Sequence, residues 1–125
     1  MIDPTTKDIY VVSKEGQAVV YVARFPHETT KTFTITKVGA LPISDVTAAD
    51  ISQDGKEILI KNYALILYWK KSENETITQL LQKTLQRAPH QPEQKGESIC
   101  WAIDGSGYFT TSESSAPPIY FYKRK

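Results

Sequence analysis

The sequence predicts an all-β protein made of about three repeats of one strand-hairpin unit. A turn signal precedes a strand three times, and those strands begin at Ile9, Ile58 and Tyr108, spaced by 49 and 50 residues. A second apolar strand follows each first one. In two of the turns an Asp-Gly pair favours a tight connection, because glycine adopts positive φ without steric cost. The three turns are Asp3-Pro4, Asp54-Gly55 and Asp104-Gly105.

The second strands are expected at residues 18–23, 64–69 and 119–123. They contain continuous apolar runs, namely VVYV, ALILYW and IYFY. A strand with no polar face must be covered on both sides, and stacked blades of a β-propeller provide such cover. A period near 50 residues is also typical of one propeller blade. The expected fold is therefore a series of consecutive antiparallel blades, with both end blades incomplete.

Residues 46–52 and 96–102 precede the second and third Asp-Gly turns and are predicted to form innermost strands. Residues 32–38, TFTITKV, alternate polar and apolar side chains, which predicts an outer edge strand with one solvated face.

One helix of roughly three turns is expected between residues 72 and 86, inserted after the second hairpin. Four apolar residues in it have helical spacing, and Ser72 with Glu75 suits a capping box. Pro89 ends the pattern. The four are Ile77, Leu80, Leu81 and Leu85.

Composition favours one globular domain over residues 1–125, with repeats at about 3–45, 46–95 and 96–125. The apolar share is 40%, the charged share 23% and the net charge +1. This balance gives no reason to expect nucleic acid as a partner, and no apolar stretch is long enough for membrane insertion. Residues 123–125, Lys-Arg-Lys, are expected to form a solvated tail. No signal peptide is recognisable, and the compartment stays open.

Several single residues receive structural interpretations in preference to functional ones. Cys100 is expected to be a buried apolar residue, and His27 and His90 to lie in surface loops. Four aromatic residues are assigned to core packing, with a ligand-binding surface as the alternative. They are Tyr63, Tyr68, Trp69 and Trp101.

Three segments, VTAADISQDG (46–55), KGESICWAIDG (95–105) and TSE (111–113), resemble bacterial β-propeller proteins of unassigned activity. The wider similarity is to six-bladed propellers and to those of phytase-like esterases and lactonases, some of which hold calcium in a central channel. The resemblance implies that Glu97, Asp50, Thr47 and Glu113 line such a channel. It makes Glu97 the candidate calcium ligand; the alternative is that Glu97 accepts backbone hydrogen bonds or pairs with a lysine. A periplasmic or secreted location would suit the parent protein.

The function predicted from the sequence is a non-catalytic binding or scaffold module, and no catalytic residue is assigned. The alternative is part of a calcium-dependent esterase, phosphatase or lactonase-like hydrolase. Closed propellers contain about four to eight blades. Three blades are therefore expected to associate with further blades of a longer chain or with a second copy, and the ligand stays unassigned.

Overall fold

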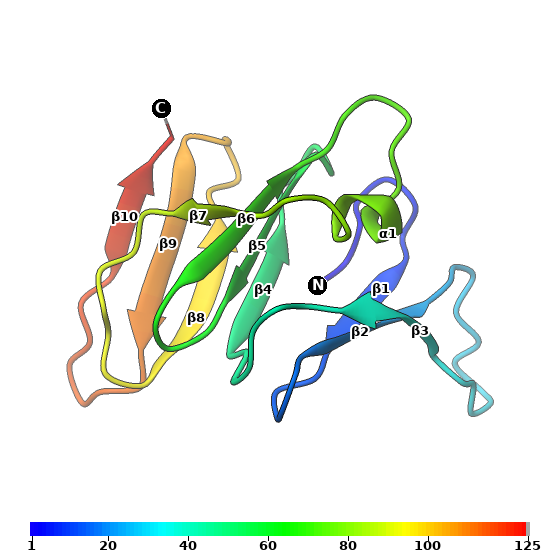
Figure 1. The fold of residues 1–125 in the computed structure, drawn as a ribbon, viewed down its shortest axis with the longest axis horizontal. Coiled ribbons are helices and arrows are strands. Elements are labelled where there is room, and N and C mark those ends of the chain that lie inside the picture. The colour runs from blue at the N-terminus through cyan, green and yellow to red at the C-terminus, as the bar shows by residue number, and fades with distance from the viewer. Residues whose placement is uncertain (125) are drawn as a thin grey trace.

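The computed structural model describes residues 1–124 and shows an all-β chain arranged in three antiparallel sheets (Figure 1). Sheet A contains β1 (Ile9–Val12), β2 (Val19–Ala23) and β3 (Thr36–Ala40). Sheet B contains β4 (Ala48–Ile51), β5 (Glu57–Lys61), β6 (Ile66–Lys70) and β7 (Gln86–Ala88). Sheet C contains β8 (Gly96–Trp101), β9 (Gly107–Ser112) and β10 (Tyr120–Lys123). The all-β prediction is confirmed.

The three predicted hairpins are β1–β2, β5–β6 and β9–β10, each paired antiparallel. Gly55 and Gly105 both have a φ of 70°, the left-handed conformation that the Asp-Gly turns require. The strands expected before these turns are β4 and β8, and each pairs with the first strand of its hairpin. Local turn chemistry therefore sets the framework of sheets B and C.

Sheet B lies between sheets A and C, and its two faces bury different side chains (Figure 1). Ile58 and Ile60 of β5 join the core shared with sheet A. Leu59, between them in sequence, joins the core shared with sheet C. Successive side chains of a strand point to opposite faces, so a continuous apolar run is what a sheet covered on both sides needs.

The predicted three-turn helix is wrong in length. Helix α1 spans only Ile77–Leu80, and its N-cap is Thr76, which forms a capping box with Gln79. Glu75 still accepts a hydrogen bond from the Ser72 backbone amide at 2.9 Å, but no helix begins there. The chain then forms β7, which pairs with β6 as the outer strand of sheet B. Pairing with the β6 edge satisfies the backbone of residues 86–88, the first of which the sequence pattern had assigned to the end of the helix.

The edge strand expected at residues 32–38 is displaced along the chain. β3 begins at Thr36 and pairs with β2, with a register shift between Val20 and Tyr21. Phe33 and Ile35, the expected buried face, are 49% and 37% exposed. Alternation alone therefore identified an edge strand but not its register.

Candidate functional site

Two of the predicted channel residues connect the neighbouring strands β4 and β8. The Thr47 hydroxyl donates to the Gly96 carbonyl oxygen at 3.1 Å, and the Trp101 amide donates to Asp50 Oδ2 at 2.8 Å. Because both side chains already bind the backbone of sheet C, they join sheets B and C along this seam.

Glu97 lies at the beginning of β8, near the Thr47 end of the seam. Its Oε1 accepts a short hydrogen bond from the Tyr63 hydroxyl, and Lys14 Nζ lies 3.4 Å away. Hydrogen bonds from Tyr63 and then from Lys14 hold the pKa of Glu97 below its usual range. Glu97 thus pairs with a lysine, one of the roles considered for it.

The carboxylates considered for calcium are not gathered at one point. Asp50 contacts the far end of β8, whereas Glu113 is exposed just beyond β9, where its amide donates to Lys95 O at 3.1 Å. Residues 1–124 contain no group of three or more His, Cys, Asp or Glu side chains able to hold a metal ion. Calcium needs six to eight oxygen ligands, so these residues do not fit it.

Cys100 is exposed, which corrects the prediction that it is buried. It lies on β8 on the face of sheet C opposite to Ile99, and Ile99 is the residue that packs toward sheet B. The alternation of the strand therefore turns Cys100 outward. Partial desolvation and the nearby Asp50 charge raise the pKa of its thiol, which disfavours the reactive thiolate.

Two oppositely charged residues of β5 are buried. Glu57 is 1% exposed and Lys61 is 0% exposed, and they stand at the two ends of the strand. Both share the strand face of Leu59, which packs against sheet C. Since a buried charge is costly unless it is paired, each needs charged or polar partners within reach.

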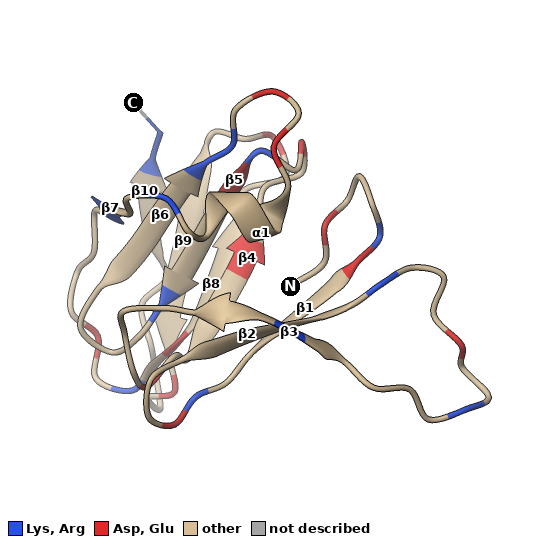
Figure 2. Cartoon of the chain, turned by 45° about the vertical axis from the view of Figure 1, so that its right-hand side comes forward, with Lys and Arg blue, Asp and Glu red and all other residues tan. Residues whose placement is uncertain are grey.

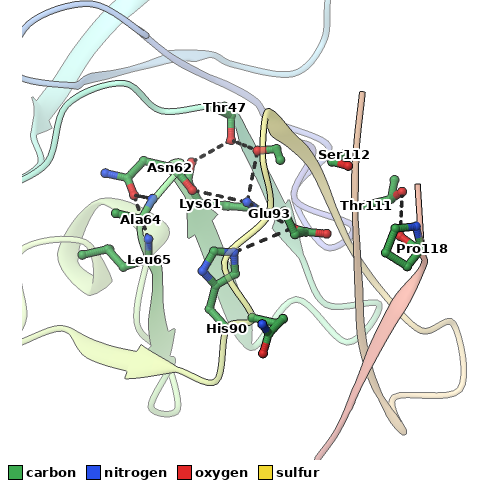
Figure 3. A network of polar contacts seen from close by, with 12 residues as sticks. Thr47, Lys61, Asn62, Ala64, Leu65, His90, Glu93, Thr111, Ser112 and Pro118 are labelled. Carbon is green, nitrogen blue, oxygen red and sulfur yellow. Dashed lines mark hydrogen bonds and ion pairs between the residues drawn. The ribbon is translucent and has the colours of Figure 1, made fainter. Parts of the chain in front are cut away.

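Lys61 finds its carboxylate partner, Glu93, in the segment leading into β8 (Figure 3). Its Nζ lies 3.4 Å from Glu93 Oε2 and donates to the carbonyl oxygens of Gly96 at 3.1 Å and Asn62 at 3.3 Å. A Cβ atom on Gly96 would lie 2.6 Å from Lys61 Nζ and 2.9 Å from Glu93 Cβ. Glycine at position 96 therefore makes room for this pair.

His90 belongs to the same cluster, which corrects its assignment to a surface loop. Its side chain is 5% exposed, and its Nε2 lies 3.7 Å from Glu93 Oε2. Neither ring nitrogen has a hydrogen-bond partner among residues 1–124. Desolvation, and next the Lys61 charge, lower the pKa of His90, while Glu93 opposes the shift. Charging His90 in the folded state is therefore unfavourable.

We expect stability to fall on acidification because of His90. Above the unfolded-state pKa near 6.5 the His90 ring is neutral in the folded and the unfolded chain. Its contribution to the free energy of unfolding is then fully present. Below that pKa the unfolded chain binds a proton more readily than the folded chain, so the free energy of unfolding falls until the folded pKa is passed. Urea titrations between pH 7.5 and 5 measure this slope. His90→Gln should flatten it and His27→Gln, in a partly exposed loop, should not; equal slopes in all three proteins would refute the assignment.

Arg124, the residue that follows β10, neutralises the charge of Glu57 and is therefore not part of a freely solvated tail. Glu57 Oε1 accepts hydrogen bonds from Arg124 Nη2 and from the Tyr68 hydroxyl, each at 2.7 Å, and Lys70 Nζ lies 3.8 Å away. Desolvation and then the Glu57 contact raise the pKa of Tyr68. The expectation of a tail fails here because a buried carboxylate attracts the guanidinium; Lys125 lies outside the described residues.

Beside Glu57 the two sheets leave a cleft of about 450 Å³, here called the B–C cleft. Basic side chains from both sheets line it, and Figure 2 shows the basic parts of β6, β7 and β10 at the same corner of the molecule. Aromatic side chains line it as well. The basic residues are Lys70, Arg87, Lys123 and Arg124, and the aromatic ones are Tyr68, Trp101 and Tyr108.

The charge of this cleft is unbalanced. Four basic residues face one acidic residue, Glu57, in a protein whose net charge is only +1. Glu57 pairs with Arg124 and Lys70, whereas Arg87 and Lys123 have no ion-pair partner among residues 1–124. A concave surface lined by one sign of charge concentrates ions of the opposite sign. The cleft is therefore suited to an anion.

The four aromatic residues considered from the sequence have different environments. Trp69 is 3% exposed and packs in the core between sheets A and B, as predicted. Tyr63 is 39% exposed, which contradicts a core role. Tyr68 and Trp101 pack in the core between sheets B and C and also line the B–C cleft.

Sequence reasoning missed the cleft because its charged residues come from distant parts of the chain. Glu57 and Arg124 are 67 positions apart. One signal was present: Glu57 and Lys61 flank the apolar residues Ile58 to Ile60, in a strand predicted to be covered on both faces. A charge in such a strand must be buried or lie at its end.

Comparison of the chain with protein-family models, curated proteins and solved structures found no match. The geometry by itself defines the class, an all-β protein of three antiparallel sheets with a basic cleft between two of them. Its one described helix, four residues long, is too short to cross a membrane.

Proposed function

We propose that the protein is a non-catalytic binding module, built from consecutive propeller-type blades, that takes an anionic ligand in the B–C cleft. The observation that carries the proposal is the pair of basic side chains at this cleft, Arg87 and Lys123, that have no acidic partner within residues 1–124. Surface cations without a partner are common, but two that share a cleft with two further cations form a focused positive site.

Support for the blade arrangement comes from the order of strands. Sheet B runs β4-β5-β6-β7 in sequence order, and its first strand lies beside β8, the first strand of sheet C. The hydrogen bonds from Thr47 and to Asp50 join these two strands. Successive propeller blades are four-stranded antiparallel sheets whose first strands surround a common axis. Loops and clefts at the ends of such rigid sheets are frequent binding sites.

The calcium-dependent hydrolase alternative has less support. Asp50 and Glu97 are occupied by protein donors, and residues 1–124 bring no three His, Cys, Asp or Glu side chains together as a metal site. A module that binds without reaction needs only the cleft.

Isothermal titration calorimetry with inorganic phosphate tests the proposal. We expect saturable binding to the wild-type chain that weakens as sodium chloride is raised, because the cations lie at the surface. The double variant Arg87→Gln with Lys123→Gln should bind at least tenfold more weakly, since each charge-assisted hydrogen bond contributes about 1.5–3 kcal/mol and about 1.4 kcal/mol is a factor of ten.

The matched control is Lys31→Gln with Lys37→Gln, which removes the same charge from exposed positions remote from the cleft. Equal losses in both double variants would mean that net charge alone attracts phosphate, and the proposal would fail. A separate measurement compares the melting temperature with and without calcium chloride. A rise in melting temperature with calcium would favour the hydrolase alternative instead.

A further inference from the structure

We infer that the ligand of the B–C cleft is an extended acidic peptide, which adds a strand to the free edge of β10 and places its carboxylates near Lys123 and Arg87. This inference rests on the proposed function and names the chemistry of the ligand. It follows from three observations: the open edge of sheet C, the backbone groups of β10 that face away from β9, and the excess of positive charge beside them.

Sheet C ends one strand earlier than sheet B. Sheet B runs β4-β5-β6-β7, whereas sheet C runs β8-β9-β10, and within residues 1–124 no strand pairs with the outer edge of β10. The hairpins β5–β6 and β9–β10 correspond in the repeat, so β10 takes the place of β6. In sheet B the edge of β6 is covered by β7, which pairs with it antiparallel. The corresponding position beside β10 is open, at the margin of the molecule (Figure 1).

The backbone groups on this open edge belong to Phe121 and Lys123. The Arg124 amide donates to Ser106 O at 2.8 Å, and pairs that exchange hydrogen bonds alternate with pairs that do not in an antiparallel ladder. Counting back from Arg124, the backbone of Tyr122 faces β9, whereas Phe121 and Lys123 face away. Outside the β9–β10 ladder, residues 1–124 form no hydrogen bond with the backbone of either residue. Both are exposed, so their amide and carbonyl groups are accessible to an added strand.

The side chains along this edge define the order of residues in the peptide. Residues directly opposite each other in paired strands interact, so an acidic residue suits the position opposite Lys123. The next peptide residue lies opposite Tyr122, which packs in the core between sheets B and C, and therefore points toward sheet B. Arg87 of β7 lines the cleft on that side. The residue after it lies opposite Phe121, whose ring packs with Phe109 at 4.8 Å between centroids, and is expected to be apolar.

A second copy of this chain suits the edge less well than an acidic peptide does. Its own β10 would bring Lys123 and Arg124 to a cleft in which four basic residues already face one acidic residue. Like charges repel, whereas acidic side chains balance Arg87 and Lys123, which have no ion-pair partner within residues 1–124. Free phosphate would meet the cations but leave the edge of β10 without a backbone partner. An acidic strand satisfies both.

Isothermal titration calorimetry on the wild-type chain compares capped peptides of sequence Thr-Glu-Glu-Val-Thr. In the expected antiparallel register the amides of the first glutamate and of valine face β10, and the amide of the second glutamate faces away. N-methylation of the two facing amides should weaken binding at least tenfold, since each backbone hydrogen bond contributes about 1 kcal/mol. N-methylation of the second glutamate is the matched control and should change the affinity by less than about threefold. Glutamine in place of both glutamates should also weaken binding at least tenfold.

A second measurement locates the bound peptide. Hydrogen exchange of the Phe121 and Lys123 amides, followed by NMR, should slow when the peptide binds, while exchange at the β3 edge should not change. Phe121→Pro removes one outward amide and should bind the peptide about tenfold more weakly than Phe121→Ala, which removes only the ring. Both variants should bind phosphate as the wild type does, because Phe121 does not line the cleft. Should Phe121→Pro not fold, the methylated peptides still decide.

The outcomes separate this inference from the proposed function. If methylation of the facing amides and of the outward amide has the same effect, the peptide does not add to β10 and the inference is wrong, even where phosphate binds. If neither phosphate nor any peptide binds, the proposed function itself fails. A dimer of the wild-type chain in sedimentation equilibrium that the peptide does not dissociate, with slow exchange at Phe121 and Lys123, would assign the edge to a second copy and also overturn the inference.

Discussion

Replacing Glu93 by glutamine is expected to destabilise the protein by about 3–5 kcal/mol, because it leaves Lys61 charged and buried without its carboxylate. The Lys61 side chain is 0% exposed, and Glu93 Oε2 at 3.4 Å is its only acidic partner within residues 1–124. A glutamine oxygen retains polarity but not charge. Equilibrium unfolding in urea at pH 7.5 measures the loss.

Two further variants interpret that result. Glu73→Gln makes the same chemical change at an exposed position and should alter the free energy of unfolding by less than about 0.5 kcal/mol. The double variant Lys61→Met with Glu93→Leu removes both charges and should be more stable than Glu93→Gln alone. If Glu93→Gln costs no more than Glu73→Gln, Lys61 does not depend on Glu93 for compensation.

Gly107→Ala is expected to cost on the order of 3 kcal/mol, because the new methyl group has no space between β9 and β10. A Cβ atom at this position would lie 2.2 Å from the backbone oxygen of Tyr122 and 2.8 Å from the Phe121 ring. A backbone oxygen cannot move without displacing its strand, so β10 must shift away from β9. The midpoint of urea unfolding should therefore fall sharply.

Gly39→Ala is the matched control for this substitution. Gly39 also lies in a strand, β3, and nothing stands within 4 Å of its hypothetical Cβ. We expect this variant to be as stable as the wild type or slightly more stable, since alanine restricts the unfolded chain. Similar losses at positions 39 and 107 would show that the close contact of β9 with β10 is not the cause.

Loss of β10 register would also displace Arg124, so phosphate binding should weaken in Gly107→Ala.

The hairpin framework was predictable because its signals are local. Asp54-Gly55 and Asp104-Gly105 specify tight turns through the backbone freedom of glycine, and both glycines have the expected positive φ. The strands on either side were found within a few residues. The helix was overestimated because Leu85 continued the helical spacing, while the chain toward β7 instead pairs with β6. Tertiary pairing overrides a local preference of this size.

The candidate site was predictable only in part. Thr47 and Asp50 belong to the strand predicted at residues 46–52, and their hydrogen bonds join this strand to β8. Glu97 and Glu113 do not join them in a common site. His90 and Arg124 were assigned to the surface, yet both reach buried carboxylates. Residue type and neighbours in sequence gave no sign of those partners.

The all-β class, the three hairpins and the strands that precede two of them follow from local sequence signals, because turn chemistry and apolar runs act over a few residues. Which charges are buried, and what neutralises them, depends instead on how the sheets pack. Lys61 donates to a carbonyl 35 positions away, and Glu57 accepts from a guanidinium 67 positions away. Burial removes water as the partner of a charge, so the protein must supply another, and the packing of sheet B against sheet C brings those distant groups within reach.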